Sequence, residues 1–67
     1  MEIITLTRKQ GTDWMLLAMY AMRKARGLGV VTVKEIDALS AYLEKNHKDG
    51  SLPTMTTKQI ERIIGRQ

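Results

Sequence analysis

The chain has 67 residues and a net charge of +4. Its length predicts one small domain over residues 1–67. Because it has no Cys, it can form neither disulfides nor thiolate metal sites. Its longest apolar run, Trp14 to Met22, is about half the length of a membrane span, and no signal-peptide pattern precedes it. We therefore expect a soluble, cytoplasmic protein, and the modest basic excess favours an anionic partner such as nucleic acid.

Residues 2–7 are rich in Ile and Thr and predict a short extended strand. Because an isolated strand is not stable, it needs a partner. Residues 30–33, Val-Val-Thr-Val, are the best candidate within the chain. In a dimer, the strand could instead pair with its own copy.

The apolar run predicts a first helix over residues 12–26, with Thr12 as N-cap and Gly27 as a left-handed C-cap. Apolar residues lie nearly all the way round this helix, so we expect it to be central and covered on more than one side.

Three methionines of this helix, Met15, Met19 and Met22, fall at positions i, i+4 and i+7. This spacing favours ordinary core packing. Since Met adapts to varied shapes, a pliable groove for a partner helix is the alternative, and the stripe could also form part of a dimer interface.

A second helix is predicted from Val33 to about Lys45, because Thr32 and Glu35 have the spacing of a capping box. Val31 and Ile36 stand at the positions of a hydrophobic staple, and Ile36 continues into a core stripe with Leu39 and Leu43. Residues 46–53 then predict a polar loop.

The last helix repeats this start, with Thr56 and Gln59 as the capping box and Met55 and Ile60 as the staple. Gly65 predicts its end.

No residues support catalysis. The chain has neither a Cys nucleophile nor a glycine-rich phosphate loop, and His47 is expected to be a solvated loop residue. We therefore expect no enzyme, no cofactor and no metal site.

Basic residues gather at the end of the first helix and along the last one, and we expect them to contact phosphates. Polar residues at the start of the last helix are close enough to a helix N-terminus to touch base edges. The predicted DNA-binding residues are Thr57, Lys58, Gln59, Arg62, Arg66, Arg23, Lys24 and Arg26.

From Leu16 to Gly65 the order of elements resembles the core of helix-turn-helix and winged-helix DNA-binding domains, although no wing follows. With the residue patterns above, which predict three helices and a short N-terminal strand, the resemblance implies a mainly α, helix-turn-helix-like fold. It also implies a small transcriptional regulator that contacts duplex DNA through its third helix. The link over residues 46–55 is longer than the turn of that motif.

Two other interpretations remain open. The N-terminal strand followed by helices also resembles the ribbon-helix-helix dimers, in which paired strands read the major groove. Alternatively, the chain is a protein-interaction module, a phage- or plasmid-type adaptor or inhibitor of a host factor, that uses the Met-rich helix and the region of Tyr42. A homodimer and a protein partner are therefore both retained as expectations, with no membrane association.

Overall fold

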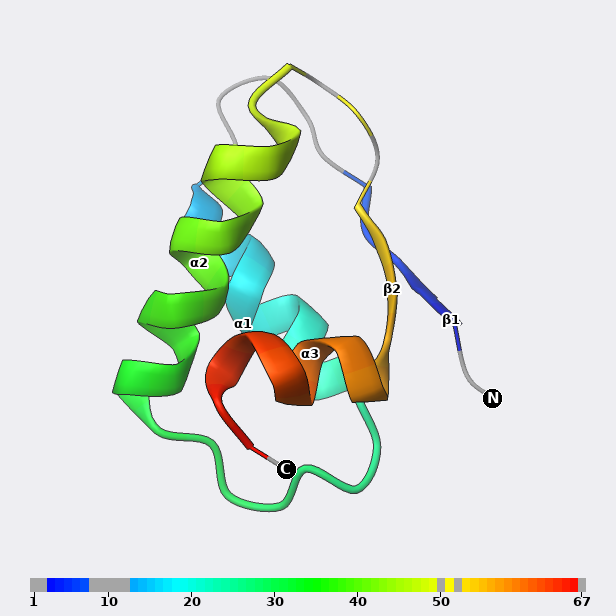
Figure 1. The fold of residues 1–67 in the computed structure, drawn as a ribbon, viewed down its shortest axis with the longest axis vertical. Helices are drawn as coiled ribbons and strands as arrows, with labels where there is room; N and C mark the ends of the chain where they lie inside the picture. Colours follow the sequence, from blue (N-terminus) through cyan, green and yellow to red (C-terminus); the bar gives the residue numbers. More distant parts are fainter. Residues whose placement is uncertain (1–2, 8–12, 50, 52, 67) are drawn as a thin grey trace.

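The computed structural model describes residues 3–7, 13–49, 51 and 53–66. In chain order the elements are strand β1 (Ile3–Thr5), helix α1 (Trp14–Lys24), helix α2 (Val33–His47), strand β2 (Thr54–Thr56) and helix α3 (Thr57–Ile64). The described part of the chain is mainly helical, with three helices and a short two-stranded antiparallel sheet (Figure 1). Among these residues, no helix has both the length and the apolar character that crossing a membrane requires.

The sheet joins the first strand to a segment near the other end of the chain. β1 and β2 run antiparallel, with Ile4 opposite Met55, and the N–H of Leu6 donates to the carbonyl of Pro53 at 2.9 Å. Both Ile4 and Met55 are buried by this pairing. The strand's partner therefore lies in its own chain, whereas the ribbon-helix-helix interpretation requires the N-terminal strands of two chains to pair.

The expected pairing of the strand with residues 30–33 is wrong. This segment forms no strand, and Val30 is almost fully exposed. The physical reason is local: the Thr32 hydroxyl caps a helix, so Val33 becomes the first residue of α2 instead of a strand residue.

α1 is shorter at both ends than the predicted helix over residues 12–26. At its start Asp13 is the N-cap, since its Oδ1 accepts the N–H of Met15 at 2.9 Å. Thr12, the predicted cap, lies outside the described residues. A carboxylate at this position also suits the positive end of the helix dipole.

The end of α1 also differs from the prediction. Ala25 is the C-cap and has extended backbone angles, while its N–H still donates to the carbonyl of Ala21 at 3.0 Å. Gly27 has the left-handed φ of 84°, but it lies two residues beyond the C-cap. It therefore turns the connection toward α2 and does not close α1, and Arg26 lies outside the helix.

The predicted capping boxes of α2 and α3 are both confirmed. α2 continues to His47, past the expected end near Lys45, and the side chain of Asn46 donates to the carbonyl of Tyr42 at 2.9 Å. The predicted loop over residues 46–53 is correspondingly shorter, and Gly50 and Leu52 of that loop lie outside the described residues.

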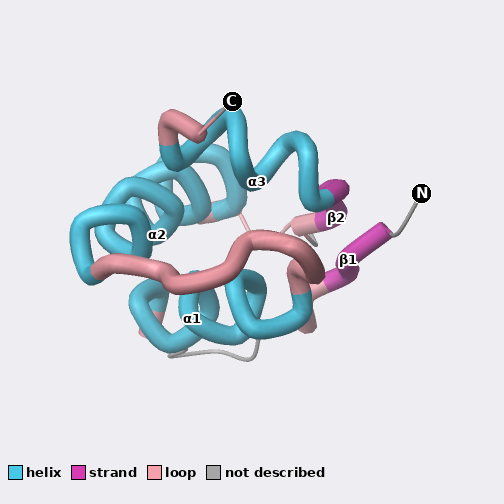
Figure 2. Tube along the Cα trace, turned by 90° about the horizontal axis from the view of Figure 1, so that it is seen from below, coloured by secondary structure: helices cyan, strands magenta, loops and turns pink. Residues whose placement is uncertain are grey.

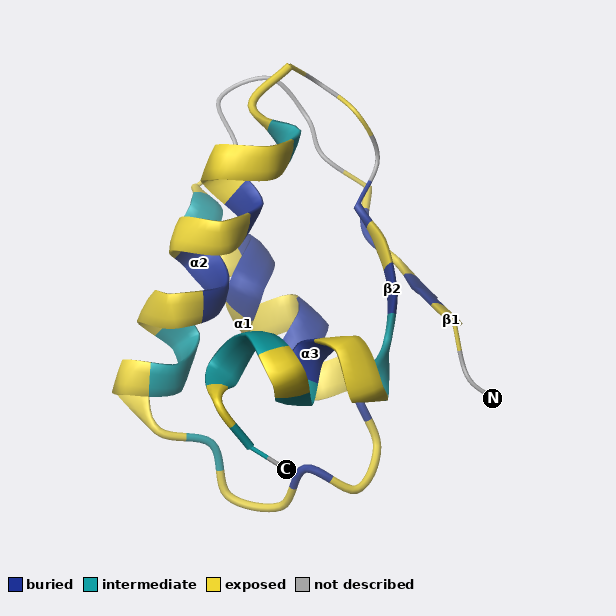
Figure 3. Cartoon of the chain, viewed as in Figure 1, coloured by how far each residue is buried: buried dark blue, intermediate teal, exposed yellow. Residues whose placement is uncertain are grey.

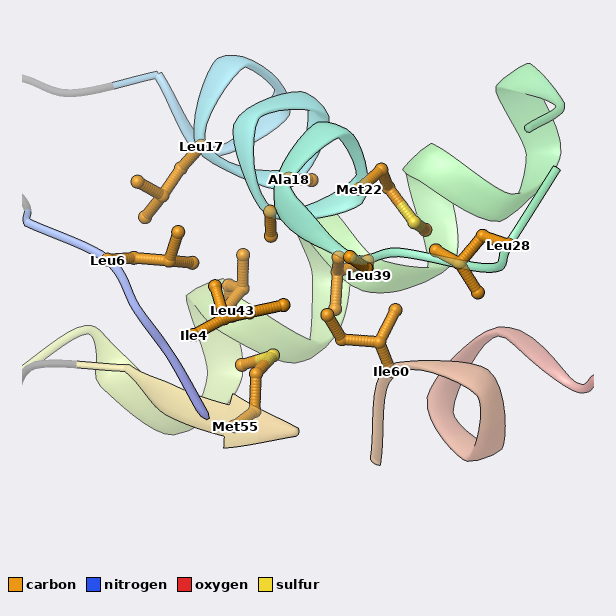
Figure 4. Close-up of a cluster of buried hydrophobic side chains, with 12 residues drawn as sticks. Ile4, Leu6, Leu17, Ala18, Met22, Leu28, Leu39, Leu43, Met55 and Ile60 are labelled. Carbon is orange, nitrogen blue, oxygen red and sulfur yellow. The ribbon is translucent and has the colours of Figure 1, made fainter. Parts of the chain in front are cut away.

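The core draws on all five elements and on the connection between α1 and α2. Figure 3 shows buried positions on the sides of α2, β1 and β2 that turn inward, and Figure 4 shows the side chains pointing into one cluster. The buried hydrophobic residues are Ile4, Leu6, Leu17, Ala18, Ala21, Met22, Ala25, Leu28, Leu39, Leu43, Met55 and Ile60. Of the predicted α2 stripe, Leu39 and Leu43 are fully buried and Ile36 is half-buried.

Figure 2 shows how the helices are layered. α1 and α3 lie on opposite sides of the fold, and the connection between α1 and α2 passes across the space between them. α2 packs against both. Exposed residues of α1 and exposed residues of α3 therefore lie on two different sides of the fold.

Candidate nucleic-acid interface

α3 is held in place at both ends and along one side. The Thr56 hydroxyl accepts the N–H of Gln59 at 3.2 Å, and the Gln59 side-chain oxygen accepts the N–H of Thr56 at 2.8 Å. The inner side is anchored by Ile60, which is fully buried beside Leu39 (Figure 4). Gly65 ends the helix with a φ of 88°, the left-handed conformation that favours glycine, as predicted.

The outer side of α3 carries two of the predicted cations. Lys58 and Arg62 are exposed and one helical turn apart, and they line a common hollow with Glu61 and Arg66. Thr57 is half-buried. Gln59 is exposed, but its side-chain oxygen is already engaged in the N-cap, so only its amide N–H groups remain for another partner.

Arg66 does not continue the row of cations on α3, because the helix ends at Ile64. Its guanidinium instead reaches back to the start of α2. Its Nη2 donates to Glu35 Oε1 at 2.9 Å, and its Nε donates to Glu35 Oε2. It also donates to the backbone carbonyls of Leu28 and Val30. Arg66 therefore ties the end of the chain to the connection between α1 and α2.

The carboxylate of Glu35 consequently has two roles. It accepts the N–H of Thr32 at 2.9 Å as part of the capping box, and it forms the ion pair with Arg66. These hydrogen bonds, with that from Arg66 the strongest cause, lower the pKa of Glu35 to about 2. The same ion pair raises the pKa of Arg66 above its already high ordinary value.

The cations of α1 lie apart from those of α3. Arg23 and Lys24 occupy the last turn of α1, and Arg26 follows in the connection; all three are exposed. Arg23 lines a hollow between α1, the connection and α2, whereas Lys58 and Arg62 line the separate hollow at α3. The structure therefore divides the predicted DNA-binding residues between two sides of the fold (Figure 2).

The outward face of α1 was not anticipated. The expectation that α1 is covered on more than one side is wrong, because Leu16, Met19 and Tyr20 are 62%, 44% and 48% exposed. The core takes only one face of the helix, chiefly Ala18, Ala21 and Met22, and the described residues do not cover the other. The signal for this surface was present in the sequence, since an apolar run of this extent exceeds what so short a chain can cover.

The predicted methionine stripe is divided in the same way. Met22 is buried, Met15 is half-buried and Met19 is exposed. Core packing is thus the role of Met22, whereas Met19 belongs to the outward face of α1.

His47 is not a solvated loop residue, since it is the last residue of α2 and is half-buried. Its Nδ1 is 2.9 Å from the hydroxyl of Ser51, and its ring lies edge-on to that of Tyr42 at a centroid distance of 6.4 Å. Among the described residues, no group of three or more His, Asp or Glu side chains is placed to hold a metal ion.

No protein-family model, curated protein or solved structure matches this chain.

Proposed function

We propose that the protein is a small DNA-binding regulator that contacts duplex DNA through the outer side of α3. The observation that carries the proposal is the pair Lys58 and Arg62, exposed one turn apart on a helix whose opposite side is anchored by the buried Ile60. A helix anchored in this way presents its cations rigidly, and Lys and Arg at such positions bind phosphates.

The arrangement of α2 and α3 supports a helix-turn-helix-like mode of binding. The two helices pack against each other in chain order, and α3 lies on the outside of the fold (Figure 1). The departure is the segment between them, which contains β2 and is longer than the turn of that motif. We therefore assign phosphate contacts to Lys58 and Arg62, and a base contact at most to Thr57 or Gln59.

Arg66 has a different part in this proposal. The Arg66 guanidinium binds Glu35 and two backbone carbonyls. Arg66 therefore anchors the end of α3, the helix that carries Lys58 and Arg62. Substituting Arg66 would disturb the fold and the interface together, so it is unsuitable for testing DNA contact.

The test is the anisotropy of a labelled DNA duplex titrated with the protein at a series of salt concentrations. We expect Lys58→Ala/Arg62→Ala to weaken binding and to reduce the slope of log affinity against log salt by about 2, one for each phosphate contact. The matched control is Arg23→Ala/Lys24→Ala, which removes the same charge from the opposite side of the fold and should change the slope much less.

Two results would contradict the proposal. One is the absence of binding to duplex DNA at low salt, where the electrostatic contribution is largest. The other is an equal loss of slope in the two double variants, which would mean that net charge, and not the α3 surface, determines binding.

A further inference from the structure

The outward face of α1 is an apolar surface on the side of the fold opposite α3. Leu16, Met19 and Tyr20 are spaced i, i+3 and i+4, so they share one face of the helix. Each is large and substantially exposed. Contiguous apolar surface of this kind on a small domain marks a site of interaction.

This face continues into a hollow of about 370 Å³. Its walls come from three segments, namely α1, the connection after it and the start of α2. The residues that line it include Met19, Met22, Arg23, Gly29, Val31 and Ile36. Since most of these side chains are apolar and two are methionines, the hollow suits an inserted aliphatic or aromatic side chain.

Positive charge lies directly beside the apolar surface. Arg23 follows Leu16 and Met19 on the same face and lines the hollow, and Lys24 places its Nζ 4.9 Å from the centre of the Tyr20 ring. The ammonium group and the ring therefore form one surface, which attracts carboxylates at its edge and apolar side chains at its centre.

We propose that this face of α1 binds an acidic amphipathic helix of another protein, which inserts one apolar side chain into the hollow beside Met19 and directs carboxylates at Arg23 and Lys24. The row of Leu16, Met19, Tyr20 and Arg23 extends over two helical turns. A partner helix with anchors at i, i+3 or i+4, and i+7 matches that length. The site is separate from the α3 surface and does not depend on DNA binding.

Charge favours such a partner over a second copy of the chain. A second copy has the same net charge of +4 and brings its own Arg23 and Lys24 to the interface. Like charges brought together at an interface oppose association, whereas an acidic helix complements them.

The probe is a synthetic peptide of about five helical turns, with Leu at heptad positions a, d and e and Glu elsewhere. A second peptide keeps every Leu and replaces each Glu by Lys. Calorimetry gives the affinity.

We expect the acidic peptide to bind saturably, and the basic peptide to bind at least about tenfold more weakly. Leu16→Ala/Tyr20→Ala should weaken binding of the acidic peptide by about tenfold or more. Tyr42→Ala is the matched control, because it removes a partly exposed tyrosine that does not line this hollow. Arg23→Glu/Lys24→Glu should reverse the preference between the two peptides.

Circular dichroism of each variant separates loss of the site from loss of the fold. The proposal is overturned if a folded protein fails to bind the acidic peptide, or if both peptides bind equally. It is also overturned if Tyr42→Ala weakens binding as much as Leu16→Ala/Tyr20→Ala does. Sedimentation gives the last outcome: a dimer that Leu16→Ala/Tyr20→Ala dissociates would show that a second copy occupies the face.

Discussion

α2 and α3 begin in the same way. In each, a threonine hydroxyl accepts the N–H of the third residue after it, and the side chain of that residue accepts the N–H of the threonine. In α2 the third residue is Glu35, which also holds Arg66 from the other end of the chain. In α3 it is Gln59, which is exposed. The two helix starts therefore have the same local hydrogen bonds, but the capping side chain of α2 also forms a long-range ion pair, whereas that of α3 is exposed.

The apolar pairs around these two starts also differ. At the start of α3, Met55 of β2 and Ile60 of the helix are both buried in the core. At the start of α2, Val31 of the preceding connection and Ile36 of the helix are only half-buried and line the hollow beside α1. The staple of α3 thus lies within the core, whereas the staple of α2 lies at the edge of the core, next in the chain to Glu35, which forms the ion pair with Arg66. The difference shows that a helix start identifies the helix but not the surroundings that stabilise it.

Removing the apolar anchors should give the largest effect. Ile60→Ala is expected to lower the free energy of unfolding by about 2–5 kcal/mol, because it leaves a cavity at a fully buried site. Ile36→Ala should lower it by roughly half as much, since Ile36 is already partly exposed. Urea denaturation followed by far-UV circular dichroism measures both, and equal losses would remove the proposed difference between the helix starts.

Breaking the ion pair should have the next largest effect. Arg66→Met removes the partner of Glu35 and leaves the carbonyls of Leu28 and Val30 without this donor. We expect a clear loss of stability that is not additive with Glu35→Gln, because both substitutions break one interaction. The double-mutant cycle tests this, and strict additivity would show that the two residues act independently.

The same pair predicts a pH dependence. The pKa of Glu35 is about 2 in the folded chain against an ordinary value of 4.5, so the unfolded chain takes up this proton first as the pH falls. Glu35 therefore stabilises the fold fully above about pH 4.5, and this contribution is lost as the pH falls toward 2. Stability measured across this window should vary less with pH in Glu35→Gln than in the native chain.

Removing either capping hydroxyl should cost about 1 kcal/mol. Thr32→Ala is expected to cost more than Thr56→Ala, because the Thr32 hydroxyl also donates to Glu35 at 3.1 Å and so helps to hold the carboxylate that binds Arg66. Thermal unfolding of the two variants decides the order, and a larger loss in Thr56→Ala would contradict this account.

The smallest effect should come from making the two starts alike. Gln59→Glu places a carboxylate in the first turn of α3, where the helix dipole favours it, and should stabilise the fold by about 0.3–1 kcal/mol at low salt. No counterpart of Arg66 is expected to augment this gain. A stabilisation that persists at high salt would contradict this account, because salt screens the interaction of an exposed carboxylate with the helix dipole.

Much of the helical structure could be predicted from local patterns. The capping boxes at Thr32 and Thr56 and the left-handed Gly65 depend on residues close in sequence, so the sequence alone identifies them. The pairing of β1 with β2 could not be predicted in this way. Residues 30–33 had the better strand composition, but the helix start at Thr32 prevailed over it.

The candidate sites were predicted only in part. Exposure of Lys58 and Arg62 follows from the helical period around Ile60. The ion pair of Arg66 could not be predicted in this way, because its partner Glu35 lies in another helix. In the sequence, Arg66 instead extends the i, i+4 spacing of Lys58 and Arg62. The exposed face of α1 does not follow from hydrophobic periodicity, which identifies apolar faces without revealing how many of them the chain can cover; only the extent of the apolar run relative to the length of the chain indicates it.

The pairing of Ile4 with Met55 has a consequence for how the chain folds. During synthesis the helices α1 and α2 can form as they emerge, because their hydrogen bonds are local. β1 must wait, without its partner, until residues 54–56 have been made. Contacts so distant in sequence slow folding, since the loop between them must close before they contribute. The first strand of the chain therefore cannot take its place until most of the chain has been made.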